Sequence, residues 1–357
     1  MGPFANSFEK NERHVIVAGR SKLFTVLGAL LAAFLLSAPF VIPYVLNNFW
    51  VNILTEILIW SLFAASVNLL FGYTGLLSFG QALFFGMGAY GVAFGLGTFG
   101  LAFWPAVLLG VTTATLTAAV IGVFAVRLTW SYFTILTVVF SLIFYLFAIG
   151  RKDITNGDDG MAFPIPPVFK IGTWEPTILN VTFQYYFVLT VVTCFYLLLW
   201  TLLRSPLGYA FRAVRENDKR TSLIGLSPYR IRYYSFVIAG LLAGTAGVMF
   251  ALFARYTTAQ YMFWTVSGEG VVWVVVGGAG TLLGPALGTA LLIILREELS
   301  VYWEHFLILV GVIVIVTVTF EPAGLMGMLK RWQARNIASK PPVEKPVGDP
   351  KHEVAKL

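Results

Sequence analysis

The chain has 357 residues, of which 58% are hydrophobic and only 11% are charged. Soluble domains carry about a quarter charged residues, so this composition excludes an ordinary soluble protein and indicates one that crosses a membrane several times. The net charge of +7 lies in loops and tails, where it bears on orientation and does not indicate nucleic-acid binding. A single cysteine, Cys194, excludes an internal disulfide.

Apolar runs of membrane-spanning length follow one another along the chain. Crossing a bilayer takes about 20 mostly apolar residues in a helix. Candidate spans lie at 23–46, 50–71, 81–99, 103–126, 130–149, 183–203, 234–254, 268–295 and 305–321. The expected fold is an all-α polytopic membrane protein with about 8–10 transmembrane helices and Gly-rich broken or re-entrant segments. Whether the part after Arg232 holds a re-entrant pair or short full crossings stays open.

Basic residues gather in three places, which are segment 1–22, loop 204–232 and tail 328–357. Short loops rich in Lys and Arg stay in the cytoplasm, so all three segments are expected there. The first and last flank a transmembrane domain at 23–327, and loop 204–232 lies within it. The Lys- and Pro-rich tail is expected to be disordered.

Two apolar stretches are interrupted by glycine. The first runs from 71 to 91 and the second from 268 to 295, where two short helices are expected to join between Gly277 and Pro285. Paired broken segments in the two halves of a transporter indicate a translocation pathway. The alternative is that small residues simply allow close helix packing. The pathway candidates are Gly75, Ser78, Gln81, Gly277, Gly280, Gly284 and Pro285.

Few polar groups lie at probable membrane depth. Glu56 in the second span is a pathway candidate because burying a charge in a membrane is costly. Glu269 is expected to reach water near an interface. Ser78 and Gln81 either contact a polar solute or cap a helix start. The histidines do not cluster, so no metal site is expected, and no phosphate-binding Gly-rich loop with Lys occurs.

Loop 204–232 has a pattern of its own. Ser205 and Pro206 form a helix start, and apolar residues then recur at helical spacing at Leu207, Ala210, Phe211 and Val214. The pattern predicts two short amphipathic helices with a turn at Asn217, the second capped by Asp218 and ended by Gly225. The apolar stripe must be buried, either in the lipid headgroup layer or in a groove of a partner protein.

This loop resembles the cytoplasmic coupling loop of ABC importer permeases, with Glu216 and Gly225 in the places of an acidic residue and a later glycine. The chain more specifically resembles the branched-chain amino-acid ABC transporter permeases. Through their order and spacing, four stretches carry this resemblance over most of the chain from about residue 50 to 327: NLLFGYTGLLSFGQALFFGMGAY (68–90), SPLGYAFRAVREN (205–217), GGAGTLLGPALG (277–288) and EPAGLMG (321–327).

The resemblance implies a permease subunit of an ATP-driven importer for a small polar solute, foremost branched-chain or related amino acids. It implies a homologous permease subunit, two cytoplasmic ATPase subunits and a periplasmic solute-binding protein as partners. The chain itself would be no enzyme and would hold no cofactor, since the partner subunits use the ATP. It would lie in the bacterial inner membrane with both termini in the cytoplasm. The residues expected to couple it to the ATPases are Arg212, Arg215, Glu216, Asn217 and Gly225.

Some residues depart from the family pattern or leave alternatives open. Trp130 stands where the family has a small residue, and Leu142 where it often has Glu or Gln, so the solute is not fixed. Segment 154–160 resembles the external loop that is read as the contact for the binding protein. A rival interpretation is an ion-coupled secondary transporter or channel, but it requires charged groups near the midplane and Glu56 is the main candidate.

Overall fold

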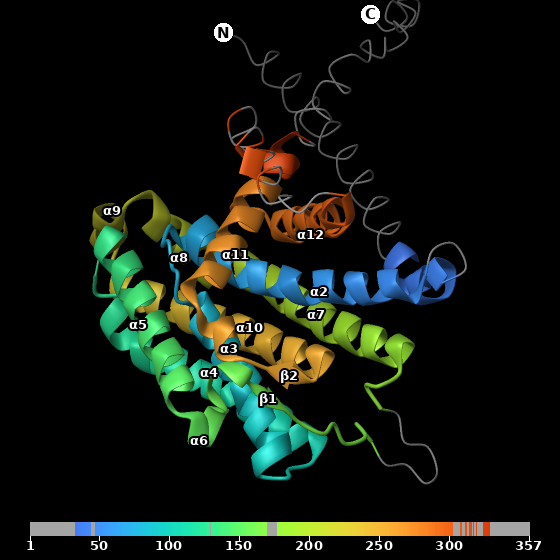
Figure 1. The fold of residues 1–357 in the computed structure, drawn as a ribbon. Coiled ribbons are helices and arrows are strands. Elements are labelled where there is room, and N and C mark those ends of the chain that lie inside the picture. Colours follow the sequence, from blue (N-terminus) through green and yellow to red (C-terminus); the bar gives the residue numbers. More distant parts are fainter. Residues whose placement is uncertain are drawn as a thin grey trace, which may run out of the picture. The chain divides into compact units, whose positions relative to one another are not determined.

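The computed structural model describes residues 33–43, 47–128, 130–169, 177–302 and 324–328, with a few residues between 308 and 319. Helices dominate the described part (Figure 1). The elements after the helix Ala33–Pro43 are α2 (Asn48–Asn68), η1 (Leu69–Thr74), α3 (Gln81–Ala93), η2 (Phe94–Thr98), α4 (Phe103–Ala125), α5 (Trp130–Gly150), α6 (Lys152–Thr155), η3 (Gly157–Asp159), β1 (Met161–Ala162), α7 (Val181–Arg204), α8 (Pro206–Glu216), α9 (Asp218–Leu223), α10 (Pro228–Ala254), β2 (Tyr256–Thr257), η4 (Ala259–Met262), α11 (Trp264–Gly277) and α12 (Gly284–Tyr302).

Five of the described helices are long and apolar enough to cross a membrane, which confirms a polytopic membrane protein. They are α2 with η1, α4, α5, α7 and α10, and each overlaps a span expected from the sequence. The expected span 81–99 is divided between α3 and the π-helical turn η2. The first and last expected spans fall largely outside the described residues.

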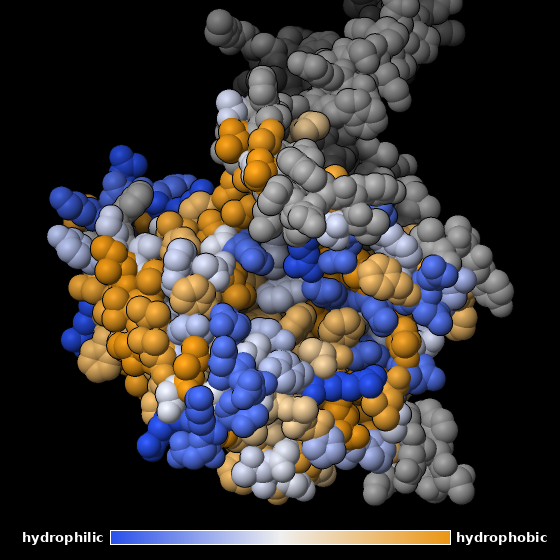
Figure 2. Space-filling view, in the orientation of Figure 1, coloured by the Kyte–Doolittle hydropathy of each residue, from blue (hydrophilic) through white to orange (hydrophobic). Residues whose placement is uncertain are grey.

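Two of these helices form the centre of the bundle, and three lie around it. In α2 and α10, 83% and 72% of the most apolar window is buried, against 33% or less in α4, α5 and α7. The outer helices expose Leu and Phe side chains, and Figure 2 shows large hydrophobic areas on the visible surface. An exposed apolar surface of this extent is what a lipid-facing helix requires.

Small residues let the central helices approach closely. A methyl group added at Gly247 of α10 would lie 1.9 Å from the carbonyl oxygen of Phe85 in α3, and one at Gly88 would lie 2.2 Å from that of Gly244. Without a hydrophobic driving force between helices in lipid, such close packing is a main source of association. Some of the glycines in stretch 71–91 therefore serve packing, as the alternative interpretation held.

Both Gly-rich stretches are broken in the structure. α2 continues as the π-helical turn η1, and residues 75–80 then run without helix to α3. α11 ends at Gly277 and α12 begins at Gly284, so the predicted break between two helices is confirmed, although α12 with 19 residues is longer than the short helix expected. Irregular backbone at membrane depth needs protein or water around it, so the surroundings of these breaks matter most.

A two-stranded antiparallel ladder joins two distant loops. Met161 of β1 pairs with Thr257 of β2, and Ala162 pairs with Tyr256. Because α10 begins beside α9 and its 27 residues extend for about 40 Å, β2 lies at the opposite end of the bundle from α8 and α9. Segment 154–160 is thereby held at that far end, by α6 and η3.

Candidate functional site

The loop between α7 and α10 folds into two short helices, as predicted. Pro206 is the first residue of α8, although the Ser205 hydroxyl donates to the carbonyl of Leu202 at 2.6 Å instead of capping the helix. α9 is capped by Asn217, whose Oδ1 accepts from the backbone N–H of Arg220 at 3.0 Å. The predicted cap, Asp218, is therefore wrong by one residue. Its carboxylate instead pairs with Arg232, and this ion pair ties α9 to α10.

The apolar stripe of α8 is buried against the protein's own helices. Ala210, Phe211 and Val214 are buried, and α8 packs on α7, α10 and η1. The predicted alternatives, the headgroup layer and a groove of a partner, are thus both wrong for this stripe. Leu207 is the exception because it stays exposed. Because α8 packs directly on η1, a movement of α8 is transmitted to η1.

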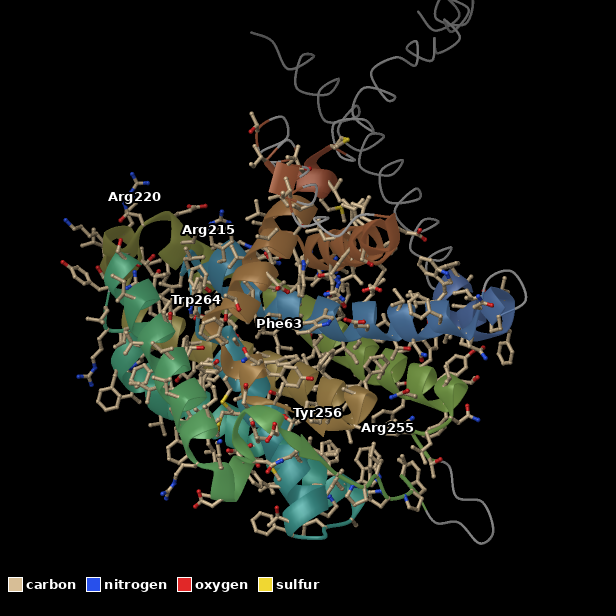
Figure 3. The ribbon with its side chains drawn as sticks, in the orientation of Figure 1. Phe63, Arg215, Arg220, Arg255, Tyr256 and Trp264 are labelled. Carbon is tan, nitrogen blue, oxygen red and sulfur yellow. The ribbon has the colours of Figure 1, made fainter. Side chains whose placement is uncertain are left out.

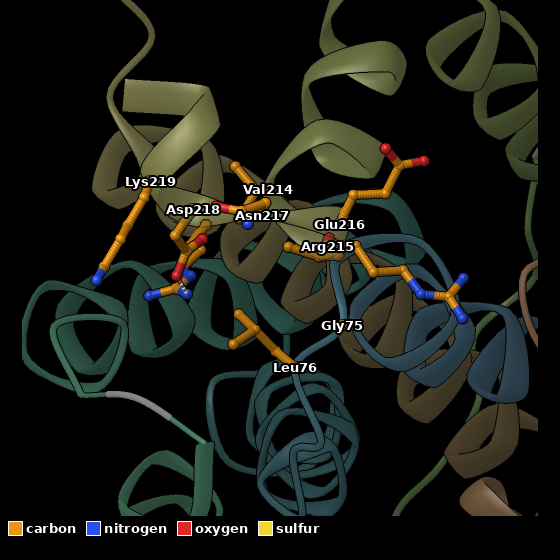
Figure 4. Close-up of a pocket in the computed structure, with 10 residues that line it drawn as sticks. Gly75, Leu76, Val214, Arg215, Glu216, Asn217, Asp218 and Lys219 are labelled. Carbon is orange, nitrogen blue, oxygen red and sulfur yellow. Dashed lines mark hydrogen bonds and ion pairs between the residues drawn. The ribbon is translucent and has the colours of Figure 1, made fainter. Parts of the chain in front are cut away.

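Arg215 joins α8 to both broken segments. Its Nη1 donates to the carbonyl of Gly72 in η1, and its side chain crosses Gly75, where an added methyl group would lie 2.9 Å from Cγ (Figure 4). The same Nη1 would lie 3.1 Å from a methyl group at Gly280, in the turn between α11 and α12. Gly75 and Gly280 have φ values of 78° and 75°, which side chains disfavour. The sequence predicted all three residues, in two separate roles, and the structure brings them together.

Asn68 fastens the two broken segments to each other, and the sequence analysis missed it. Its Nδ2 donates to the carbonyl of Thr281 at 2.8 Å, and its Oδ1 accepts from the N–H of Gly280 at 2.9 Å. Thr281 in turn accepts at its Oγ1 from the N–H of Gly284 at 3.1 Å. Asn68 is only 3% exposed at the end of α2. The available signal in the sequence was an amide side chain at the start of the mostly apolar stretch 68–90.

Gly277, Gly284 and Pro285 form the joint of α11 with α12. A methyl group at Gly277 would lie 1.8 Å from the carbonyl oxygen of Gly284. Gly284 and Pro285 begin α12 and are both buried. These residues lie beside the turn that Asn68 and Arg215 hold. We therefore define the coupling junction as Asn68, Gly72, Gly75, Arg215, Gly280 and Thr281, with this joint next to it.

Ser78 and Gln81 lie apart from the coupling junction, at the start of α3. Both are buried; Ser78 Oγ accepts from the N–H of Gly80 at 3.2 Å, and Gln81 Oε1 accepts from Ser66 Oγ at 3.3 Å. The capping interpretation of Ser78 is wrong, because the N-cap of α3 is Gly80 and not Ser78. Sequence reasoning missed Ser267, which donates to the carbonyl of Phe79 and accepts from the N–H of Ala82, both at 2.8 Å.

The outward side of α8 and α9 is charged and open. Glu216 is exposed and points away from a pocket of about 430 Å³ between the segment after η1 and the α8–α9 turn (Figure 4). Figure 3 shows Arg215 and Arg220 at this same end of the molecule. Arg212 lies 5.7 Å from the ring centre of Tyr73, which adds a cation–π contact to η1. An added methyl group at Gly225 would meet nothing within 4 Å.

The remaining candidates lie elsewhere. Glu56 is in α2, well away from the coupling junction along the helix, and contacts Arg296 of α12. Glu269 is exposed on α11. Leu142 is exposed on the outer helix α5, so its departure from the family pattern concerns the surface of the bundle.

Comparison with known proteins supplies the family. Residues 49–318 match the family described as branched-chain amino acid transport system / permease component. The chain belongs to this family. It is 28% identical over 319 residues to the high-affinity branched-chain amino acid transport system permease protein LivM of Escherichia coli strain K12, covering 84% of this chain and 75% of the relative.

Two further relatives match the chain at lower identity or over a shorter length. The probable branched-chain amino acid transport permease protein LivM of Methanocaldococcus jannaschii is 23% identical, covering 77% of this chain and 94% of the relative. The autoinducer 2 import system permease protein LsrC of Enterobacter sp. strain 638 is 30% identical over 135 residues, covering 32% of this chain and 38% of the relative. No solved structure matches the chain.

Family membership decides between the two functions that the sequence left open. The chain is a permease component of a branched-chain amino acid ABC transport system and not a self-sufficient secondary transporter or channel. Permease subunits of this family have no ATPase activity of their own, so the chain is not an enzyme. It is a multi-pass membrane protein that works with partners in a transporter complex.

Proposed function

We propose that the chain forms one half of the membrane pathway of an importer for branched-chain or related amino acids, and that the coupling junction passes movement from the ATPases to this pathway. The supporting observation is the position of Arg215. One side chain of α8 contacts η1 through Gly72 and the α11–α12 turn through Gly280. Displacement of α8 therefore displaces both glycine-broken segments together.

The proposed partners are those that membership of the permease family implies. A homologous permease subunit supplies the other half of the pathway, and two cytoplasmic ATPase subunits bind the exposed side of α8 and α9. The docking residues are Arg212, Arg215, Glu216, Asn217 and Gly225. Basic loops stay inside, which places this end and both termini in the cytoplasm of a cell with an inner membrane. Segment 154–160 then faces a periplasmic solute-binding protein from the opposite end.

The pathway lies along the broken segments in this account. Gly75, Gly277, Gly280, Gly284 and Pro285 give the backbone freedom to change its path at the joint, while Ser78 and Gln81 position the start of α3. Glu56 of α2 belongs to the same pathway, farther along the helix from the coupling junction. Because irregular backbone survives only beside protein or water, opening and closing at these breaks changes access to the pathway.

Reconstitution of the complete complex in proteoliposomes tests this function. Uptake of radiolabelled L-leucine should require ATP on the side of the membrane that carries the ATPase subunits. It should also require the leucine-loaded binding protein on the opposite side. It should persist when a protonophore and a sodium ionophore collapse the ion gradients. Leucine uptake that continues without ATP and stops with the ionophores would refute the proposal. Uptake of a different solute by the same ATP-dependent route would refute only the choice of substrate.

A further inference from the structure

Charged side chains meet on the face formed by α2, α11 and α12. Arg296 Nη2 donates to Glu56 Oε1 at 3.2 Å and to Glu297 Oε1 at 3.1 Å, while its Nε lies 3.3 Å from the same Glu297 oxygen. Glu269 of α11 lies close enough to interact with the charge of Arg296. We call Glu56, Glu269, Arg296 and Glu297 the ionic cluster.

The ionic cluster lies deep in the membrane. Glu56 belongs to α2, whose cytoplasmic end at Asn68 is fixed to the coupling junction. Twelve residues of helix place Glu56 about 18 Å from that end, at 1.5 Å per residue. The apolar span runs from Asn48 to Thr74, so Glu56 also lies eight residues, or about 12 Å, inside the other end of the span and within the hydrocarbon core. The direct contact with Glu56 sets Arg296 at the same depth.

This face does not suit contact with lipid. The side chain of Arg296 is 39% exposed and that of Glu56 is 16% exposed. Figure 2 views the molecule onto the side of α2 and α11 and shows hydrophilic residues among hydrophobic ones there. Ionisable groups within a membrane face a bundle interior or a water-filled cavity because their exposure to lipid is costly. The ionic cluster therefore borders an aqueous path or a second subunit.

A buried aromatic cluster adjoins the ionic cluster. Trp60, one turn along α2, donates from Nε1 to Glu56 Oε1 at 3.1 Å. Its ring lies edge-on to Trp273 with centroids 5.3 Å apart, and 4.9 Å from that of Phe250. Tyr261 lies within electrostatic reach of Glu56 and packs against Phe250. The charged groups thus stand beside a buried aromatic cluster, in which Trp60 is 8% and Trp273 is 6% exposed.

Hydrogen-bonding capacity in the ionic cluster is left open. Among the residues that the structure describes, no hydrogen bond reaches Arg296 Nη1 or Glu56 Oε2. The ionic cluster also has three carboxylates and one guanidinium, so it accommodates a further positive group more readily than a negative one. A ligand with one ammonium and one carboxylate a few ångströms apart matches both features.

We propose that the ionic cluster is a transit site for the charged head of an α-amino acid, with the carboxylate on Arg296 and the ammonium on Glu56. This inference rests on the proposed function, since it assumes that an amino acid passes through the chain. Breaking a buried ion pair is costly because it leaves a charge unpaired. Here the substrate replaces each lost partner with its own opposite charge, so the pair opens without leaving either group unpaired.

Ligand binding by the wild-type transporter complex in nanodiscs, without the binding protein, is the first test. Saturation-transfer difference NMR detects weak ligands, and three probes separate the two charges. L-leucine carries both, L-leucinamide lacks the carboxylate, and 4-methylpentanoate lacks the ammonium. The leucine signal should exceed each of the other two at least threefold. Equal signals from all three probes would overturn the proposal without any variant being needed.

Variants then locate the site. Arg296→Gln and Glu56→Gln should each lower the leucine signal at least fivefold and lower leucine uptake in proteoliposomes at least tenfold. Co-purification of the ATPase subunits, which reports an assembled complex, should match that of wild type. Glu298→Gln, an exposed neighbour on α12, is the matched control and should change neither readout. A leucine signal at the wild-type level in both pathway variants contradicts the proposal.

The two levels of inference fail separately. If the wild-type complex shows ATP-driven leucine uptake but the variants Arg296→Gln and Glu56→Gln transport at the wild-type rate, the transit site is wrong and the proposed function stands. If the wild-type complex shows no ATP-driven leucine uptake, the proposed substrate fails first. If Arg296→Gln does not assemble, the comparison of the three probes on the wild-type complex decides.

Discussion

Replacement of Asn68 by alanine should loosen the coupling junction. The amide of Asn68 makes two hydrogen bonds, to the carbonyl of Thr281 and from the N–H of Gly280, at 2.8 and 2.9 Å. Both partners are backbone groups in the irregular turn between α11 and α12, where no helical partner replaces the lost bonds. The variant Asn68→Ala therefore leaves one donor and one acceptor unsatisfied in a largely buried place.

The size of the effect follows from those two groups. An unsatisfied buried polar group costs about 1–3 kcal/mol, and side-chain hydrogen bonds in membranes average nearer to 0.6 kcal/mol. Two groups give about 2 kcal/mol as a central value. For domains of 150–250 residues, 1 kcal/mol shifts Tm by about 2–4 °C, so a fall of roughly 4–8 °C is expected.

The assay is thermal unfolding of the purified transporter complex in detergent, with leucine uptake per ATP hydrolysed measured in parallel. Asn52→Ala serves as the matched control, since Asn52 lies on the same helix and makes no hydrogen bond among the described residues. Asn68→Ala should lower both Tm and the coupling ratio, and Asn52→Ala should lower neither. An unchanged Tm and coupling ratio for Asn68→Ala would refute the structural role given to this amide.

Three further variants probe separate parts of the account. Gly72→Ala places a methyl group 2.0 Å from Asn68 Oδ1 and 2.4 Å from the nitrogen of Gly280, so its Tm should fall by at least as much as that of Asn68→Ala; an equal or higher Tm would show that the segments are not held in contact. Ser267→Ala removes bonds to Phe79 and Ala82 and should lower the free energy of unfolding by about 2 kcal/mol, and Tm with it. Ser300→Ala, at an exposed position, should leave Tm unchanged. Glu216→Trp alters an exposed side chain and should keep Tm but reduce ATP-coupled uptake at least tenfold; unimpaired coupled uptake would remove Glu216 from the docking surface.

The sequence predicted the elements well because their signals are local. Apolar length marks α2, α4, α5, α7 and α10, and glycine with proline marks the break between α11 and α12. The serine–proline start of α8 is likewise local. The capping of α9 was misassigned because Asn217 and Asp218 are both good caps and the pattern does not say which one has extended backbone.

Contacts between distant segments could not be predicted in this way. The burial of Phe211 depends on α7, α10 and η1 coming together beneath α8, which no periodicity in the loop reveals. Asn68 contacts Gly280 across more than two hundred residues of sequence. Arg296 directly follows the predicted span 268–295 and was assigned no role. Its ion pair with Glu56 nevertheless places it within the membrane-spanning part of the bundle.

The central claim is that Arg215 transmits movement from α8 to both broken segments, and the ratio of leucine transported to ATP hydrolysed tests it most directly. In proteoliposomes with the complete complex, Arg215→Ala should keep ATPase activity within twofold of wild type while leucine uptake falls at least tenfold. Arg230→Ala, an exposed arginine of the same loop without a hydrogen bond or ion pair among the described residues, should keep both rates. A wild-type ratio of leucine to ATP in Arg215→Ala would contradict the claim.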